Sequence, residues 1–303
     1  MALITEMLQE SCRTHARKTA LRHKVAGRWV EYSYATIWST SDQIAAGLVE
    51  WGLEAGDRVA LLAQSSPAWV MAYFGILKSS AIAVPIDKDL KQGELRHIIA
   101  DCGARVLFTE KSYLDLILDI AENLPQLEKI VLLNQEPTQK GQIPPKVEHA
   151  LALLISEWHR LSQRYKIKDD DIQAFEGLAE DFQQLVMPTG TKQGDKKKNF
   201  FNRLLRDPDE KNPVFSVENL EDFQKASPPP LTSCQPNGLA VILYTSGTTG
   251  RSKGAMLSHR NITSNVRTAI ELFGLDPSMH TLSFLPINHV FEQVAGIILP
   301  LAV

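Results

Sequence analysis

Between Asp57 and Asn134 the chain alternates short apolar segments with segments of helical pattern, and this alternation constrains the fold more than any other feature. The segments DRVALLA, AIAVPI, ARVLFTE and EKIVLLN are typical of strands, and AWVMAYFGILKSS, GELRHIIADCG and YLDLILDIAENL are typical of helices. Strands that are apolar at nearly every position are buried on both faces, so repeated strand and helix units indicate a parallel sheet. We therefore expect an α/β fold with parallel sheets flanked by helices.

The sequence before, within and after this alternation predicts that the chain has three parts. Residues 1–134 form the first α/β part, which opens with an amphipathic helix and a hairpin turning at Ala26-Gly27. Residues 135–213 form an inserted segment, helical from about Val147 to Val186 and then rich in charges and helix breakers. Residues 214–303 return to the α/β pattern: the strand LAVILYT precedes a glycine-rich loop, and SHRNITSNVRTAIELFG is a helix stopped by Gly274.

Composition excludes several classes of protein. A formal net charge of -3 over 303 residues gives no basic field for nucleic acid. The three cysteines, Cys12, Cys102 and Cys234, form no CxxC pair, which argues against a disulfide framework and fits a reducing, cytoplasmic compartment. The first residues lack the apolar core of a signal peptide, and no apolar run reaches the roughly 20 residues that span a bilayer. Peripheral attachment to a membrane remains an open alternative.

The stretch LYTSGTTGRSKGAMLSH (243–259) has the composition of a phosphate-binding loop. Glycines let backbone N–H groups converge on an anion, and hydroxyls can donate to phosphate oxygens or ligate Mg²⁺. Lys253 adds a flexible positive charge that suits a triphosphate. The candidate nucleotide-binding residues are Thr245, Ser246, Gly247, Thr248, Thr249, Gly250 and Lys253. Thr249 is also the candidate Mg²⁺ ligand.

Other motifs compete for the same residues. Walker A requires a lysine directly after the second glycine, but Arg251 follows Gly250. The dinucleotide fingerprint GxGxxG is absent. Residues 250–254 do satisfy GxSxG, yet a nucleophile elbow places its serine on a tight turn directly after a strand, and here a Gly/Thr-rich loop intervenes. A glycine-rich connection without any ligand is the plainest alternative, which the concentration of hydroxyls and cations disfavours.

YTSGTTGRSKGAMLSHRN resembles the long and specific phosphate-loop signature of the adenylate-forming enzymes: acyl-CoA synthetases, luciferases and peptide-synthetase adenylation domains. Residues 52–86 are similar to an early block of that family. The segment LSFLPINHVFEQ (282–293) resembles its next motif, in the form of the long-chain fatty-acid branch. The likeness covers roughly residues 4–134 and 214–303. It implies that 1–134 and 214–303 are two parts of one AMP-binding domain, with 135–213 inserted between them.

The resemblance implies an ATP-dependent acid–thiol ligase. A fatty-acid carboxylate attacks the α-phosphate of ATP, which yields acyl-adenylate and pyrophosphate, and coenzyme A then displaces AMP. In-line attack needs charge neutralisation, which Mg²⁺, Lys253 and loop N–H groups could supply. The resemblance also places His289 at the acyl site as the candidate catalytic residue, beside Phe291; the alternative is a histidine packed at a helix start. Glu292 is interpreted as a structural anchor, and Tyr244 and Phe284 as core aromatic residues.

In the family, the residues for adenine and ribose, a Mg²⁺-binding glutamate and the catalytic lysine of a small C-terminal domain all come later than any residue here. The expectation is therefore an incomplete large N-terminal domain, inactive alone, that works with a separate C-terminal half. Two alternatives stay open: a non-catalytic ATP- or acyl-binding module or decayed ligase, and, among enzymes, an aryl-CoA ligase or a peptide-synthetase adenylation domain.

Overall fold

The computed structural model describes residues 2–25, 27–121, 123–133, 216–220, 234–245 and 251–303. The chain divides into two compact units, residues 1–134 with 219–303, and residues 135–218. A short strand, β7 (Ser216–Asn219), spans the boundary between them. The inserted segment expected at 135–213 lies outside the described residues and stays a prediction.

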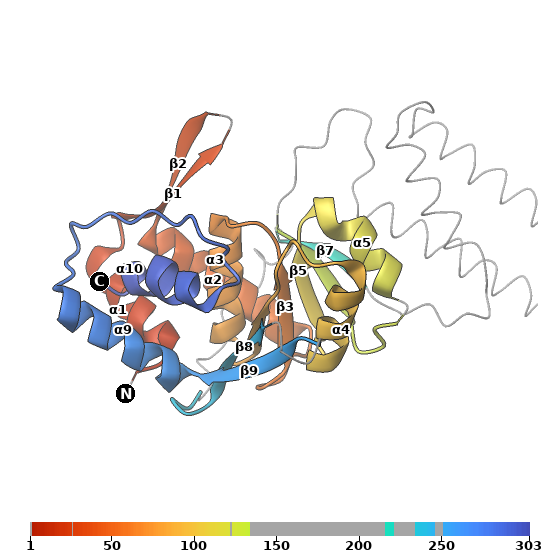
Figure 1. Cartoon of the computed structure of the whole chain (residues 1–303). Helices are drawn as coiled ribbons and strands as arrows, with labels where there is room; N and C mark the ends of the chain where they lie inside the picture. Colours follow the sequence, from red (N-terminus) through yellow and green to blue (C-terminus); the bar gives the residue numbers. More distant parts are fainter. Residues whose placement is uncertain (1, 26, 122, 134–215, 221–233, 246–250) are drawn as a thin grey trace, which may run out of the picture. The chain divides into compact units, whose positions relative to one another are not determined.

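A mostly parallel sheet forms the centre of the first unit (Figure 1). Its strands lie in the order β6-β5-β3-β4-β8-β9. The bounds are β3 (Arg58–Leu62), β4 (Ile82–Pro85), β5 (Val106–Thr109), β6 (Lys129–Leu132), β8 (Leu239–Thr245) and β9 (Lys253–Ser258). All neighbouring pairs in this order are parallel except β8 and β9, which pair antiparallel. The α/β fold expected from the alternating apolar segments is confirmed.

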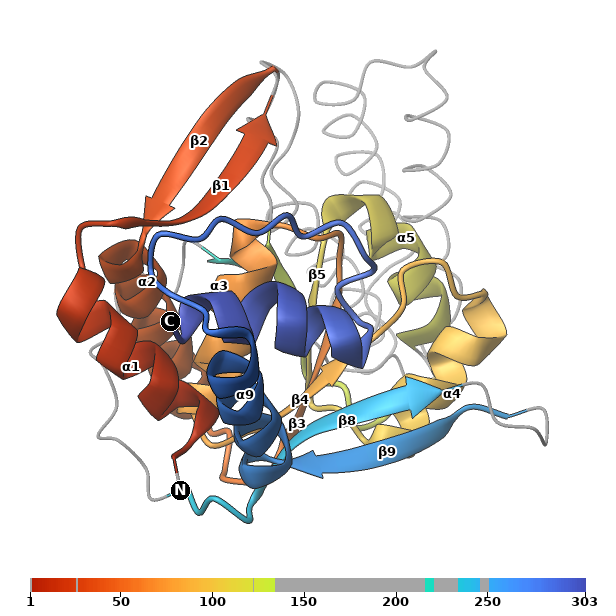
Figure 2. The same ribbon diagram turned by 60° about the vertical axis from the view of Figure 1, so that its left-hand side comes forward.

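Helices cover both faces of the sheet (Figures 1 and 2). On one face lie α1 (Ile4–His15), α2 (Tyr34–Glu50) and α3 (Pro67–Lys78), and on the other α4 (Gln92–Cys102) and α5 (Lys111–Ala121). The helix starts follow the sequence: the hydroxyl of Ser33 accepts the N–H of Thr36, and that of Ser66 accepts the N–H of Trp69. Pro67 occupies the first position of α3, where its missing N–H costs no hydrogen bond.

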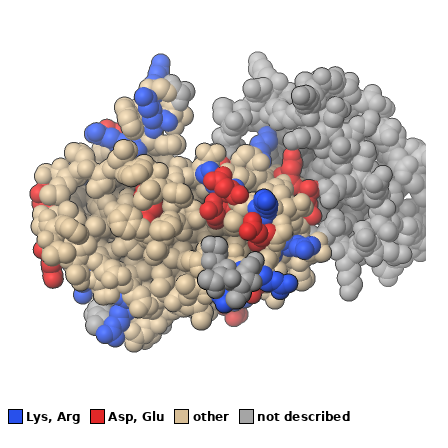
Figure 3. All heavy atoms as spheres, viewed as in Figure 1, with Lys and Arg blue, Asp and Glu red and all other residues tan. Residues whose placement is uncertain are grey.

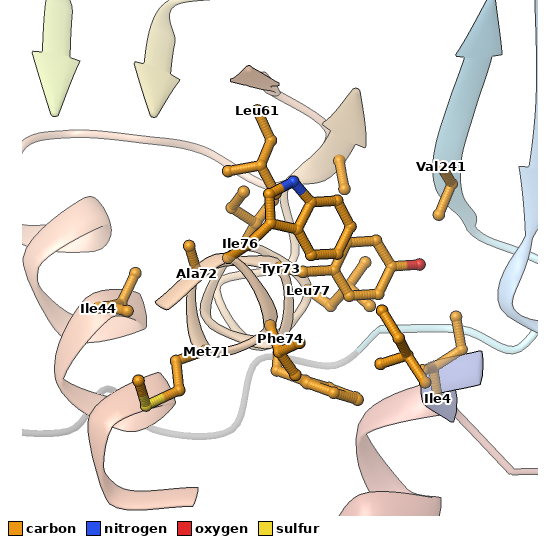
Figure 4. Close-up of a cluster of buried hydrophobic side chains, with 14 of the residues drawn as sticks. Ile4, Ile44, Leu61, Met71, Ala72, Tyr73, Phe74, Ile76, Leu77 and Val241 are labelled. Atoms are coloured by element: carbon orange, nitrogen blue, oxygen red, sulfur yellow. The ribbon is translucent and has the colours of Figure 1, made fainter. Parts of the chain in front are cut away.

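The core is centred on α3, whose side chains point outward in all directions into apolar surroundings (Figure 4). Ile76 lies toward Leu61 of β3, and Tyr73 toward Val241 of β8. The sequence of α3 is apolar around its whole circumference, which is the pattern of a helix buried on every side. Helix α3 thus packs against both β3 and β8, and β8 leads into the candidate site.

Two segments lie outside this core. The expected hairpin forms a separate two-stranded sheet, β1 (Thr19–Val25) with β2 (Arg28–Ser33), and Gly27 at its turn adopts a φ of 82°. At the other end, α9 (His259–Phe273) is followed by an irregular stretch and then by helical residues, η2 (Glu292–Ile298), which is a π-helix, and α10 (Leu299–Leu301). No described helix combines the length and apolarity that crossing a bilayer requires.

Two core assignments, Phe284 and Tyr244, are wrong. Phe284 lies in the irregular stretch after α9 and its side chain is 76% exposed. Phe284 lies in the segment Leu282–Pro286, which forms neither a helix nor a strand, so no periodicity reports burial there and apolar character alone suggested the core. Tyr244 is half-buried and lies outside the core: its ring lies beside Gly254 of β9, and its hydroxyl donates to Asp101.

Candidate phosphate-binding site

The candidate loop connects β8 to β9, and the structure places its two ends side by side. Thr245, the last residue of β8, pairs with Lys253, the first residue of β9. Both are exposed, so their side chains are free to meet a ligand in solvent. The five predicted residues between them, Ser246, Gly247, Thr248, Thr249 and Gly250, lie outside the described residues and their roles stay predictions.

β9 was not expected from the sequence, which predicted only a loop and then a helix. Its residues KGAMLS pair along the whole of β8, and Gly254 shows why the pairing is close. A Cβ atom at Gly254 would lie 2.7 Å from Cγ2 of Ile242 and 3.2 Å from Cζ of Tyr244. Glycine therefore permits the tight approach of the second strand beside the loop. The strand ends at Ser258, whose hydroxyl accepts the N–H of Asn261 and caps α9.

A shallow hollow of about 500 Å³ lies beside the start of β9. It is lined by α4 residues and by Asn123, Arg251 and Ser252. Arg96 and Arg251 are exposed at this hollow, which adds positive charge next to Lys253. Glu94 also lines the hollow, so two guanidinium groups face one carboxylate there, and the remaining positive charge favours an anion such as phosphate through charge-assisted hydrogen bonds. Within the described residues, no group of three acidic, histidine or cysteine side chains could hold a metal ion.

His97 and Asp101 of α4 contact the two strand ends, and the sequence analysis missed both residues. His97 Nε2 lies 3.2 Å from the carbonyl oxygen of Ser252, so the ring N–H donates to that oxygen. The hydroxyl of Tyr244 donates to Oδ2 of Asp101 over 2.6 Å. Burial and the neighbouring Asp101 carboxylate raise the pKa of Tyr244, so its hydroxyl keeps its proton. The four-residue spacing of His97 and Asp101 places both on one face of a helix, but it does not show which residues that face contacts.

These contacts also exclude the nucleophile-elbow reading of Ser252. A serine, a histidine and an aspartate do lie close together, but His97 binds the backbone carbonyl of Ser252 and Asp101 binds Tyr244. Ser252 directly precedes a strand, whereas an elbow serine follows a strand and precedes a helix. The group therefore lacks the arrangement of a catalytic triad.

His289 lies in the turn before the last helical residues. Its side chain is exposed and its Nδ1 accepts the N–H of Phe291 over 3.2 Å. Its carbonyl accepts the N–H of Gln293, which makes His289 a helix-start residue. In the described part of the chain no hydrogen bond joins His289 to Thr245 or Lys253. Its catalytic role stays a prediction.

Glu292 follows in the same segment and is 3% exposed. Its Oε1 finds no hydrogen-bond partner among the described residues. A Cβ at Gly296 would lie 2.2 Å from that oxygen, so the small residue makes room for the carboxylate. The expected role of Glu292 as a structural anchor stays a prediction.

A mostly parallel α/β sheet whose strand β8 leads into a glycine- and hydroxyl-rich connection is typical of nucleotide-binding domains. The chain belongs to the AMP-binding enzyme family, since the sequence model of that family matches residues 8–303. The expected resemblance is therefore confirmed.

Curated relatives are fatty-acid ligases. The chain is 26% identical over 296 residues to long-chain-fatty-acid–CoA ligase ACSBG1 of Rattus norvegicus, and the match covers 96% of this chain and 32% of that protein. It is 26% identical over 304 residues to ACSBG2 of the same organism, covering 99% of this chain and 36% of that one. The chain thus spans about a third of the length of these relatives.

Solved structures confirm the fold. Anthranilate CoA ligase AuaEII, in complex with anthranoyl-AMP, matches with a TM-score of 0.63 and 24% identity, over 100% of this chain and 43% of that chain. ATP-bound MatB from Rhodopseudomonas palustris matches with a TM-score of 0.60 and 20% identity, over 98% and 43%. At these identities the likeness concerns the fold alone.

Proposed function

We propose that this chain supplies the phosphate-holding part of an ATP-dependent ligase that activates a long-chain fatty acid to acyl-adenylate and then to acyl-CoA. The observation that carries the proposal is the meeting of Thr245 and Lys253 at the open end of the β8–β9 hairpin, in a chain of the AMP-binding family. Relatives named as long-chain-fatty-acid–CoA ligases support the substrate class. ATP, Mg²⁺ and coenzyme A are the proposed co-substrates and cofactor.

The described residues fit a nucleotide's phosphates. Thr245 offers a hydroxyl and Lys253 a cation from adjacent, exposed strand ends. Gly254, the residue after Lys253, lets the side chains of Ile242 and Tyr244 pack directly against the backbone of β9. We propose that Ser246, Gly247, Thr248, Thr249 and Gly250 complete the site, with Thr249 toward Mg²⁺. The metal would neutralise charge on the phosphates when bound.

In this proposal the chain's own residues act by position and charge. Lys253 holds the β- and γ-phosphates and stabilises the charge that builds on the leaving pyrophosphate. The attacking carboxylate is already ionised at neutral pH, so no local general base is required. His289 would donate a hydrogen bond to that carboxylate, and Phe291 would border the acyl chain.

The chain spans about a third of the length of its curated relatives, so we infer that turnover also needs residues from the remaining part of such a ligase. The surface of the first unit offers a place for them. Large apolar side chains are exposed in α9 and in the stretch after it: Leu272, Phe273, Met279, Leu282, Phe284 and Phe291. The region over α9 and α10 carries few charged side chains in the view of Figure 3. Exposed apolar area of this kind marks an interface.

ATP–pyrophosphate exchange tests the proposal. The 303-residue chain is assayed alone and together with a polypeptide that carries the remaining part of the ACSBG1-like relatives. We expect exchange only when both are present, faster with hexadecanoate than with an aryl acid or an amino acid. Faster exchange with the aryl acid would favour an aryl-CoA ligase instead. If no carboxylate supports exchange in the mixture, the chain is a binding module and the ligase proposal fails.

A further inference from the structure

Helix α4 touches both ends of the β8–β9 connection (Figures 1 and 2). Asp101 accepts the hydroxyl of Tyr244, the residue directly before Thr245. His97 donates to the carbonyl of Ser252, the residue directly before Lys253. Each contact is therefore one residue away from a described member of the proposed phosphate site.

α4 is itself firmly held. Leu95, Ile98 and Ile99 bury one face of the helix, each at 2% exposure or less. At its C-terminal end the guanidinium of Arg58 donates to the carbonyls of Cys102 over 2.7 Å and Gly103 over 3.1 Å. These bonds satisfy carbonyl groups that a helix end leaves without partners. The backbone of α4 is therefore held in place, and so are the positions of His97 and Asp101 on its opposite face.

We propose that His97 and Asp101 are positioning residues of the phosphate site, which hold the paired ends of the hairpin, Thr245 and Lys253, in place against α4 before nucleotide binds. The inference rests on the proposed function. It means that contacts from α4 keep the phosphate site in its binding geometry before the nucleotide arrives. Neither residue touches substrate; each acts through the strand end it binds. Fixing the loop ends in advance lowers the entropy that the nucleotide would otherwise have to remove.

The chemistry of the two contacts favours this role over incidental packing. The Tyr244–Asp101 bond joins a neutral hydroxyl to a carboxylate, the stronger kind of hydrogen bond. The His97 bond fixes a backbone carbonyl rather than a mobile side chain, so it acts on the course of the main chain into Lys253. One bond holds the outgoing strand and the other the returning strand.

Limited trypsin digestion measures the effect at the site itself. Trypsin cleaves after Arg251 and Lys253, both exposed, and mass spectrometry identifies peptides that end at these residues. At low protease concentration the cleavage rate follows the equilibrium for local opening. The intact 303-residue chain is digested with and without Mg·ATP, and global stability is followed by thermal unfolding.

Tyr244→Phe and His97→Ala are each expected to raise the ligand-free cleavage rate at Arg251 about fivefold, and to raise the Mg·ATP concentration for half-protection by a similar factor. His97→Gln keeps an N–H donor and should restore nearly wild-type cleavage. Asp101→Ala combined with Tyr244→Phe should add little to either single change, because both remove the same bond. Tyr32→Phe and His23→Gln on the separate β1–β2 sheet are matched controls and should leave cleavage unchanged.

The outcomes separate this inference from the proposed function. If Mg·ATP protects the wild-type chain and the variants cleave and bind like it, the positioning role is wrong while the phosphate site stands. If Mg·ATP protects no form, the proposed function fails, and the ligand-free rates still decide whether α4 holds the loop ends. A general fall in melting temperature, with faster cleavage at every site and no rescue by His97→Gln, would reduce both residues to ordinary stabilising contacts and overturn the inference.

Discussion

His259 couples the stability of the fold to pH. Its side chain is 1% exposed at the start of α9, where Nδ1 accepts the N–H of Ile4 over 3.4 Å. Burial lowers its pKa to about 4, against a smaller opposing effect of Glu6. The unfolded chain takes up this proton below about pH 6.5 and the folded chain only below about pH 4. The unfolded state therefore binds more protons between these values, and stability falls as pH is lowered through them.

Replacing His259 by glutamine should remove that dependence. Between pH 6.5 and 4 we expect the slope of the unfolding free energy against pH to decrease by up to about 1.4 kcal/mol per pH unit. Urea unfolding at several pH values measures the slope, and His23→Gln, on the edge of the β1–β2 sheet, should retain it. An unchanged slope in His259→Gln would mean that the imidazole is not buried in its neutral form.

At the scale of elements, the contact between α2 and α3 depends on one glycine. A Cβ at Gly75 would lie 2.6 Å from Cγ2 of Ile44 and 3.1 Å from the carbonyl oxygen of Ser41, both in α2. Gly75→Ala would therefore force the two helices apart, which we expect to lower the unfolding free energy by about 2 kcal/mol. Gly93→Ala in α4, where nothing lies within 4 Å, is the matched control and should be neutral or slightly stabilising.

Chemical denaturation of the two variants compares them directly. Equal unfolding free energies for Gly75→Ala and Gly93→Ala would contradict the close packing of α2 on α3, because the methyl group at position 75 would then fit without moving α2.

The same scale shows what the sequence could and could not reveal. The continuous apolar segments and the Ser66–Pro67 helix start identified β3 to β6 and α3. Elements that are buried on all sides are apolar at nearly every position, and this can be seen in the sequence. The sequence of β9, KGAMLS, lacks such an apolar pattern, because four of its six residues are exposed. The strand is held by its pairing with β8. His97 and Asp101 likewise gain their significance only from the tertiary placement of α4 beside that hairpin. Five members of the candidate site lie outside the described residues, so the sequence motif alone supports them.

At the scale of the whole molecule, the exposed apolar side chains of α9 and the following stretch predict how the chain behaves in solution. A hydrophobic dye such as 8-anilinonaphthalene sulfonate should bind this chain and fluoresce strongly. Adding the complementary polypeptide used in the exchange assay should lower the fluorescence as the surface becomes covered. Leu272→Glu with Phe273→Glu should weaken that effect. Dye fluorescence that is unchanged by the complement would contradict an interface at α9.

The account depends on the residues between β8 and β9 being the contact for a nucleotide's polyphosphate. Hydrogen–deuterium exchange of the peptide that covers residues 243–257, with and without saturating Mg·ATP, tests this directly. We predict slower exchange there with Mg·ATP and little change with Mg²⁺ alone, and we predict that Lys253→Ala reduces the protection without altering exchange in the core strands. Protection confined to another part of the chain, or identical protection in Lys253→Ala, would contradict it.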